Sequence, residues 1–221
     1  NLRTETYNSF AIEKEIEVIY NLVDVKRFDK KPLDAFRKVL APKGERIITH
    51  ASNFRKVKRV NDIIQVFAKI NKVIPSKLLM VGDGPERPGT EELCRALNVC
   101  DDVRFLGKQQ EMEEILAISD LFMLTSEYES FGLSALEAMA AGVPVLSSNA
   151  GGIPEINIHG ETGYMANIGD IEELSKLGID LLKDDTKLNG FKQRAKEQAM
   201  KFDIHHIVPL YEELYERFVH V

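Results

Sequence analysis

The sequence predicts an α/β fold, a Rossmann-like parallel sheet with helices on both faces. Short apolar runs bounded by turn residues alternate with segments of helical period from residue 46 onward, and this alternation is typical of βαβ units. The strands of such units run parallel, and their helices cover both faces of the sheet. The chain has 221 residues, of which 44% are hydrophobic. That is enough to bury the core of one large α/β domain or of two small ones.

The expected strands and helices follow one another in pairs along the chain. Strands are expected at residues 46–51, 77–81, 103–106, 121–125 and 144–147. Helices are expected between them at residues 58–73, 90–97, 112–118 and 133–141. One face of the first helix carries the apolar residues Val60, Ile63, Ile64, Phe67 and Ile70. After residue 163 the strand signal ends, and three further helices are expected at residues 171–182, 187–201 and 204–219. Upstream, residues 16–19 are expected to form a strand that runs into a turn-rich passage.

Charge and composition exclude several classes of function. The net charge of -6 disfavours duplex nucleic acid as a partner, because that binding depends on Lys and Arg neutralising phosphates. No run approaches the roughly 18 apolar residues of a membrane span, and the N-terminal residues lack the layout of a signal peptide. A cytoplasmic address is therefore expected. Cys94 and Cys100 are too widely spaced for a metal or redox motif and are expected to be reduced thiols.

Metal and cofactor motifs are also missing from the sequence. No Asp-x-Asp triplet flanked by apolar strands occurs, so neither a divalent metal nor another cofactor is expected. The histidines show no ligand spacing with carboxylates or thiols and are expected to be structural or on the surface; those considered are His50, His159, His205 and His206.

The segment SEYESFGLSALEAMAAGVP, residues 126–144, holds the most informative motif of the chain. It places a polar turn between a buried strand and a helix, at the carboxyl end of a parallel strand, where open α/β sheets bind ligands. A helix that begins near Leu133 directs its free N–H groups and positive dipole end toward that crevice. Gly132 lets a phosphate approach the backbone. The motif therefore predicts an anion site.

Two carboxylates flank this turn, Glu129 before the helix and Glu137 within it, eight positions apart. Along a helix axis this spacing corresponds to about 12 Å, which exceeds the roughly 5 to 9.5 Å between the paired acids of a glycoside hydrolase. The two groups are therefore not expected to share one water or one glycosidic bond. Their separation suits an extended ligand held at both ends, with its anionic middle at the helix N-terminus. The alternative is a helix with ordinary surface glutamates.

The run from Glu129 to Glu137 matches the E-x7-E element of retaining glycosyltransferases with the GT-B fold, and it closely resembles the C-terminal domain of family 4 enzymes. Further matches lie in order along most of the chain: IEVIYNLVD at residues 16–24, VGDGP at 81–85 and GGIPE at 151–155. Taken alone, the last two would be a turn and a loop. Several matches in the right order make a chance resemblance improbable.

The resemblance implies a donor site for a sugar nucleotide. It implies that Glu137 accepts hydrogen bonds from the ribose hydroxyls and that Glu129 faces the transferred sugar. Backbone amides near Phe131, Gly132 and Leu133 would meet the sugar and the distal phosphate. The matched turn after the second strand adds Gly82 to the donor-binding candidates, and the loop after the third strand adds Lys108 and Gln109, which correspond to residues that contact the base in similar enzymes.

Four bases cluster in SNFRKVKR, residues 52–59, between the first strand and the first helix. A departing pyrophosphate needs fixed cations beside it, because negative charge builds on its bridging oxygen as the glycosidic bond breaks. Family members usually carry an Arg here and a Lys five positions later. Lys58 falls on the Lys, whereas Asn53 stands at the donor-binding position of the Arg. Lys58 is therefore the first candidate, Arg55 the second, and Arg59 the other possible substitute; the alternative for the arginines is a solvated helix start.

Within the family, the run at residues 50–60 and FLGKQ at residues 105–109 resemble one branch, which begins bacillithiol biosynthesis. This resemblance implies UDP-N-acetylglucosamine as donor and L-malate as acceptor, with no metal. One rival interpretation is a family 4 hexosyltransferase with a lipid or polysaccharide acceptor. Others are a sugar-nucleotide epimerase of similar fold and a noncatalytic nucleotide-binding module. A homo-oligomer stays open.

Three segments are expected on these grounds. Residues 1–24 would be a remnant of an N-terminal domain and the interdomain connection, because the chain begins with Asn1 rather than Met and residues 20–24 are turn-rich. Residues 25–203 would form the donor-nucleotide-binding domain, the C-terminal half of a GT-B fold. Residues 204–221 resemble the C-terminal helix that crosses back toward an N-terminal Rossmann-like domain, which would supply the contacts to L-malate.

Overall fold

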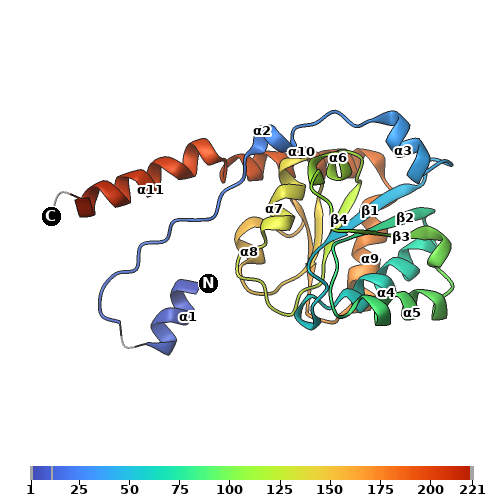
Figure 1. Ribbon diagram of the computed structural model, residues 1–221, viewed down its shortest axis with the longest axis horizontal. Helices are drawn as coiled ribbons and strands as arrows, with labels where there is room; N and C mark the ends of the chain where they lie inside the picture. Colours follow the sequence, from blue (N-terminus) through green and yellow to red (C-terminus); the bar gives the residue numbers. More distant parts are fainter. Residues whose placement is uncertain (1, 11, 220–221) are drawn as a thin grey trace.

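A single parallel sheet forms the centre of the computed structural model, which describes residues 2–10 and 12–219. Its strands lie in the order β3-β2-β1-β4-β5-β6, and every neighbouring pair is parallel (Figure 1). The strands are β1 (Arg46–Ala51), β2 (Ser76–Val81), β3 (Val103–Gly107), β4 (Leu121–Leu124), β5 (Val145–Ser148) and β6 (Gly163–Ala166). The predicted Rossmann-like fold is confirmed.

Helices cover both faces of this sheet (Figure 1). The core of one face is shared with α4 (Val60–Asn71), α5 (Arg87–Ala96) and α9 (Ile171–Leu182). The core of the other face is shared with α3 (Asp34–Leu40), α6 (Met112–Ala117) and α7 (Leu133–Ala140). Helix α10 (Asp185–Met200) contributes to both cores. The short helices α2 (Val25–Phe28) and α8 (Ile153–Ile156) complete the second layer.

The central strand shows why the sequence signal was clear. In β1 the four residues from Ile47 to His50 are fully buried, because helices pack on both sides of the strand. β6 was not predicted: it has four residues, begins with a glycine and pairs with β5 alone among the described strands. The helix expected from residue 58 begins instead at Val60, because residues Lys56–Lys58 form a 3-10 turn and Arg59 has a left-handed φ of 48°.

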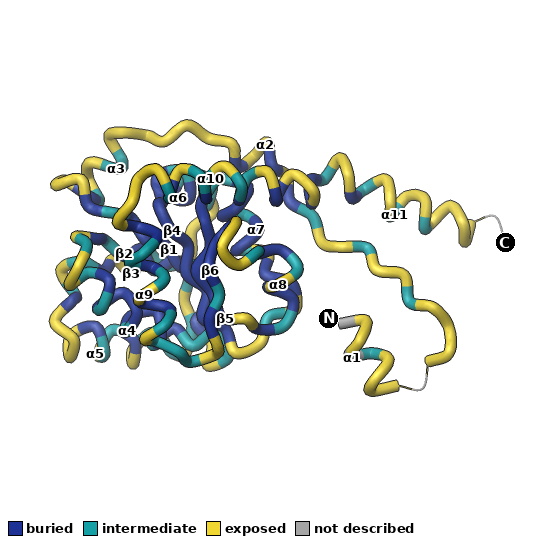
Figure 2. The backbone as a smooth tube through the Cα atoms, turned by 180° about the vertical axis from the view of Figure 1, so that it is seen from behind, coloured by how far each residue is buried: buried dark blue, intermediate teal, exposed yellow. Residues whose placement is uncertain are grey.

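The strand predicted at residues 16–19 is wrong. Residues 15–22 have no regular secondary structure, and most of them are exposed to solvent (Figure 2). A strand needs a partner for its N–H and C=O groups, and none of the described strands pairs with this segment. It follows the short helix α1 (Leu2–Ser9), which was not predicted.

The segment before residue 25 meets the segment after residue 203 at one point. Val23 forms a parallel bridge with Asp203, in which the Val23 N–H donates to the Phe202 carbonyl and the Ile204 N–H to the Val23 carbonyl, both at 2.9 Å. From there α11 (Ile204–Val219) extends away from the sheet (Figure 1). Residues 1, 11, 220 and 221 of the predicted outer segments lie outside the described residues, and the predicted domain limits stay a prediction.

No helix in the described ranges combines the length and the apolar character that a membrane crossing requires.

Candidate functional site

The loops at the carboxyl ends of the strands carry the predicted site residues. Asn53, Arg55 and Lys58 follow β1, and Gly82 follows β2. Lys108 and Gln109 follow β3, and the run from Glu129 to Glu137 follows β4. All of them therefore lie at one edge of the sheet, where parallel α/β folds bind ligands.

Glycines allow these loops to touch one another directly. A Cβ on Gly82 would lie 1.8 Å from the Ser52 carbonyl oxygen, so the loops after β1 and β2 meet backbone to backbone. A Cβ on Gly151 would lie 1.9 Å from the Glu129 carbonyl oxygen, and one on Gly152 would lie 2.3 Å from that of Ser130. The glycine pair after β5 thus supports the loop before α7, a contact that its sequence alone does not reveal.

Lys58 and Glu129 form an ion pair at the centre of this edge. The distance between Lys58 Nζ and Glu129 Oε2 is 2.5 Å, and the side chains are 19% and 13% exposed. The Ser126 hydroxyl lies 3.4 Å from the same carboxylate oxygen. The two residues come from different loops, so the fold brings the first candidate cation of the sequence analysis into contact with one of its two candidate acids.

Hydrogen bonds fix the backbone on both sides of this pair. The Thr125 hydroxyl donates to the carbonyls of Lys58 and Arg59 at 3.3 and 3.1 Å. The Glu127 N–H donates to Val57 O at 2.8 Å, and the Gly152 N–H donates to Glu129 O at 2.7 Å. Thr125 was not among the predicted site residues, although its place at the end of a buried strand was a usable signal.

The N-terminus of α7 is open to an anion. Gly132 occupies the N-cap with a φ of +95°, and it has no side chain that could cap the first N–H groups. A Cβ there would also lie 2.4 Å from Ile153 Cδ1. Leu133, the first helical residue, is 47% exposed. Free N–H groups and the positive end of the helix dipole therefore face outward beside the ion pair.

Glu137 lies one turn further along α7 and is half-buried. Burial raises the pKa of its carboxyl above 4.5; Arg27 partly opposes this shift, and Glu113 adds to it. Arg27 itself is paired with Glu113 at 3.1 Å. Within the described residues no hydrogen bond or ion pair engages the Glu137 carboxylate, which leaves its oxygens available as acceptors.

The remaining bases of the cluster differ in how far they are engaged. Arg59 Nε is 2.7 Å from Asp62 Oδ2, so this guanidinium is held by its own helix. Asn53 and Arg55 are exposed in the loop after β1. Of the two arginines that could take the place of the usual Arg, Arg59 is held in an ion pair, whereas Arg55 is exposed to solvent.

The loop after β3 presents exposed side chains. Lys108 and Gln109 are both exposed, and the Gln109 amide donates to the Leu106 carbonyl at 2.6 Å. This bond folds Gln109 back onto its own loop.

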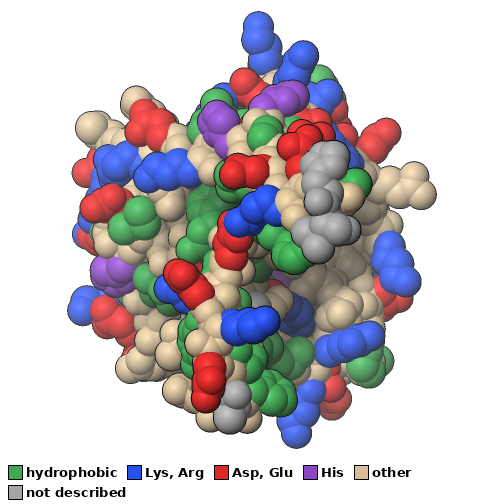
Figure 3. Space-filling view, turned by 90° about the vertical axis from the view of Figure 1, so that its left-hand side faces the viewer, with side chains coloured by type: hydrophobic (Ala, Val, Ile, Leu, Met, Phe, Trp, Pro, Cys, Tyr) green, Lys and Arg blue, Asp and Glu red, His purple; other side chains and the backbone are tan. Residues whose placement is uncertain are grey.

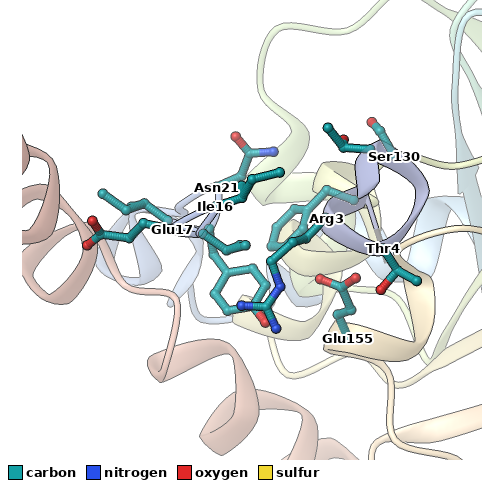
Figure 4. A pocket seen from close by; sticks show the side chains of 12 residues that line it. Arg3, Thr4, Ile16, Glu17, Asn21, Ser130 and Glu155 are labelled. Atoms are coloured by element: carbon teal, nitrogen blue, oxygen red, sulfur yellow. The ribbon is translucent and has the colours of Figure 1, made fainter. Parts of the chain in front are cut away.

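Phe131 contributes its ring to packing rather than to the open surface. It is 5% exposed and packs against the rings of Tyr20 and Phe202, with centroid distances of 6.0 and 5.7 Å; those two rings also touch each other at 5.5 Å. Tyr20 also lines a pocket of about 650 Å³ between the N-terminal segment and the loop before α7. Arg3 and Glu155 point toward one another across it, with Ser130 at its rim (Figure 4). Neither Lys58 nor Glu129 lines this pocket, so it is separate from their ion pair.

His50 is buried at the end of β1, as a structural histidine. Its Nδ1 donates to the Met123 carbonyl at 2.9 Å, and its Nε2 accepts from the Ser52 hydroxyl at 2.8 Å. Burial lowers the pKa of its imidazole to about 4. Within residues 2–10 and 12–219 no group of three or more His, Cys, Asp or Glu could hold a metal ion, and the metal-free expectation stays a prediction.

Viewed from the side on which α11 leaves the body, the surface mixes charged side chains of both signs with apolar ones (Figure 3). No single sign of charge covers that face.

Comparison with known proteins supplies a family. The profile of the family Glycosyl transferases group 1 matches residues 33–198. An N-acetyl-alpha-D-glucosaminyl L-malate synthase from Bacillus anthracis is 43% identical over 217 residues, which cover 97% of this chain and 57% of the synthase. A 2-deoxystreptamine N-acetyl-D-glucosaminyltransferase from Niallia circulans is 32% identical over 148 residues, or 66% of this chain and 38% of that enzyme. The chain thus spans little more than half the length of the first relative.

Solved structures share the fold. HepE from Anabaena, crystallised with UDP-glucose, is 26% identical with a TM-score of 0.82, over 93% of this chain and 57% of HepE. Sucrose-phosphate synthase from Thermosynechococcus elongatus is 24% identical with a TM-score of 0.87, over 98% of this chain and 56% of the synthase. In each case the matching part is about half of the larger protein.

Proposed function

Since this chain belongs to the glycosyl transferases group 1 family, we propose that it holds the sugar-nucleotide donor of a retaining enzyme. In the whole enzyme, N-acetylglucosamine passes from UDP-N-acetylglucosamine to L-malate. One observation carries the proposal: the uncapped N-terminus of α7 lies between Glu129 and Glu137, with Lys58 beside it. An anionic diphosphate suits that position because N–H dipoles and an ammonium group converge there.

Each residue has a distinct role in this proposal. The Glu137 carboxylate accepts hydrogen bonds from the ribose hydroxyls, and the Glu129 carboxylate accepts from the transferred sugar. Lys58, Arg55 and the N–H groups of Gly132 and Leu133 stabilise the diphosphate. The loop with Lys108 and Gln109 contacts the uracil, largely through backbone groups.

The proposed reaction breaks the bond between the sugar C1 and the distal phosphate oxygen. The malate hydroxyl forms the new bond to C1 on the same face, and its proton passes to the departing phosphate, so the configuration is retained. Lys58 and the α7 N-terminus lower the barrier by stabilising the charge that builds on the diphosphate. No protein nucleophile is required.

The choice of donor and acceptor rests on the relatives. Both curated enzymes described above bear names that specify N-acetylglucosaminyl transfer, and one of them names L-malate. HepE, which shares the fold, was crystallised with a uridine diphosphate sugar. These names support UDP-N-acetylglucosamine more than any other donor. The assignment of L-malate as acceptor rests on the name of the first relative alone.

A thermal-shift panel tests the donor. UDP, GDP, ADP and their sugars are compared on the 221-residue chain, with and without EDTA. We expect the largest stabilisation from UDP-N-acetylglucosamine and no effect of EDTA. A larger shift with GDP or ADP compounds would contradict the uridine assignment, and loss of the shift with EDTA would contradict metal-free binding.

A transfer assay tests the division of labour. The chain is incubated with UDP-N-acetylglucosamine and L-malate, and the product is measured by mass spectrometry. We expect almost no product, because acceptor contacts are proposed to come from residues outside this chain. Robust turnover would refute that part of the proposal.

A further inference from the structure

The Lys58–Glu129 ion pair has a consequence for which ligand the site prefers. We propose that Glu129 makes the site favour an intact sugar nucleotide over a bare nucleoside diphosphate, because its carboxylate holds Lys58 whenever no sugar engages it. This inference rests on the proposed function and adds a specificity-determining role for Glu129.

The pair is close enough and buried enough to compete with a ligand. At a separation of 2.5 Å the ammonium and carboxylate groups are in direct contact, and neither side chain is more than 19% exposed. Removing one partner of such a pair leaves the other charge without compensation in a poorly hydrated place. The Ser126 hydroxyl, 3.4 Å away, is too distant to replace the ammonium group.

Backbone hydrogen bonds tie down the loops on which the two residues lie. Bonds from Thr125 to the Lys58 carbonyl and from Gly152 to the Glu129 carbonyl hold both loops in place. A ligand that reaches Lys58 therefore has to take it from Glu129, so binding requires an exchange of partners at this pair.

Two kinds of ligand differ in what they offer this pair. A bare diphosphate takes Lys58 and leaves Glu129 beside a second anion without a donor. A sugar nucleotide takes Lys58 with its diphosphate and offers sugar hydroxyls to Glu129, so both side chains gain a new partner. After transfer the sugar has left, and Glu129 again competes with the diphosphate for Lys58, which favours release of the spent nucleotide.

Calorimetry of UDP and UDP-N-acetylglucosamine with the Glu129→Gln chain tests the inference. Glutamine keeps the side-chain shape but releases Lys58, so we expect UDP to bind about tenfold tighter than to the wild-type chain. We expect UDP-N-acetylglucosamine to gain nothing, because it loses its charged acceptor. The preference for the sugar nucleotide should therefore shrink or reverse.

Glu127→Gln is the matched control. Glu127 lies two residues earlier in the same loop and is exposed, so its replacement removes the same charge without touching the pair. We expect both affinities to stay within about twofold. An equal gain in the Glu127 variant would assign the effect to net charge and overturn the inference.

The remaining outcomes also decide between the two levels of the proposal. If wild type binds UDP but Glu129→Gln binds it no tighter, or gains equally for both ligands, the specificity role is wrong and the donor site stands. If wild type binds neither ligand, the proposed function and this inference fall together. Glu129→Asp, whose shorter carboxylate is withdrawn from Lys58, supplies the same comparison if the glutamine variant does not fold.

Discussion

Each edge of the sheet contains an acidic side chain shielded from solvent, buried Asp120 at the amino edge and half-buried Glu137 at the carboxyl edge, and the two differ in their partners. At the amino edge, Asp120 is 5% exposed and accepts from Arg37 at 2.6 Å, from Lys192 at 2.9 Å and from the Ile47 N–H at 3.0 Å. Burial works to raise its pKa, but these partners outweigh burial and hold the pKa below its usual value. The Asp120 carboxylate is therefore satisfied within the folded chain.

At the carboxyl edge, Glu137 is the counterexample. Burial raises its pKa, and Arg27 offsets the shift only in part because Arg27 is paired with Glu113. A buried charge that has hydrogen-bonding partners is compatible with a stable fold, whereas one without partners costs stability. A ligand that supplies the missing donors can offset this cost. The comparison separates a carboxylate that the folded chain satisfies from one whose oxygens have no hydrogen-bond partner among the described residues.

The largest effect is expected from breaking the amino edge. Asp120→Ala leaves Arg37 and Lys192 without their acid and the Ile47 N–H without its acceptor. We expect a loss of about 3 kcal/mol in the free energy of unfolding, measured with urea. UDP affinity of the folded chain should stay the same, because the site lies at the other edge.

Asp185→Ala is the control for this loss. Asp185 pairs with Arg46, but its side chain is 78% exposed, so the expected change is below about 1 kcal/mol. Equal losses in the two variants would mean that the buried Asp120 ion pairs stabilise the fold no more than the exposed Asp185 pair does.

Replacing Glu137 is expected to reduce ligand affinity rather than stability. Glu137→Ala should weaken UDP binding by about 1.5 to 3 kcal/mol, because ribose hydroxyls lose a charged acceptor. Since the pKa of Glu137 is raised, wild-type affinity should fall on acidification at a higher pH than an ordinary glutamate with a pKa of 4.5 would cause. Calorimetry at pH 7.5 and 5.5 should show this extra loss in wild type and not in Glu137→Gln.

The free energy of unfolding should respond differently to replacement of Glu137 than to replacement of Asp120. A carboxyl whose folded pKa is raised costs stability above its unfolded pKa, and this cost disappears as the pH falls below that value. We therefore expect Glu137→Gln to be as stable as wild type or slightly more stable at neutral pH. A destabilised glutamine variant with unchanged UDP affinity would make Glu137 structural, like Asp120.

His50 tests the same comparison through the pH dependence of stability. It lies near the carboxyl edge, yet it is satisfied by Met123 and Ser52 and has a pKa of about 4 instead of 6.5. The unfolded chain therefore binds the proton more readily, so this contribution is complete above pH 6.5 and is lost as the pH falls toward 4. Between pH 7 and pH 5 we expect wild type to lose about 2 kcal/mol more than His50→Gln in urea unfolding. Parallel losses would show that the imidazole is not buried as a neutral group.

Local pattern determined most of the fold, and together with the family resemblance it indicated where the candidate site lies. The strand at Arg46–Ala51 and the helix at Ile204–Val219 have their predicted bounds, because a buried run or a period of 3.6 residues is written in neighbouring positions. The E-x7-E spacing likewise indicated an uncapped helix start between two acids. Local patterns failed in two places. The four-residue strand β6 was too short to be recognised, and the apolar run at residues 16–19 has no strand to pair with among the described residues.

Tertiary structure decided which of these residues meet. Lys58 and Glu129 are 71 positions apart and touch because β1 and β4 are neighbours in the sheet, an order that no local period encodes. The same holds for the support of Glu129 by Gly151 and for the capture of Asp120 by Arg37 and Lys192. Side-chain type and local spacing are properties of the chain, whereas the partner that satisfies or frees a buried charge is a property of how distant segments pack.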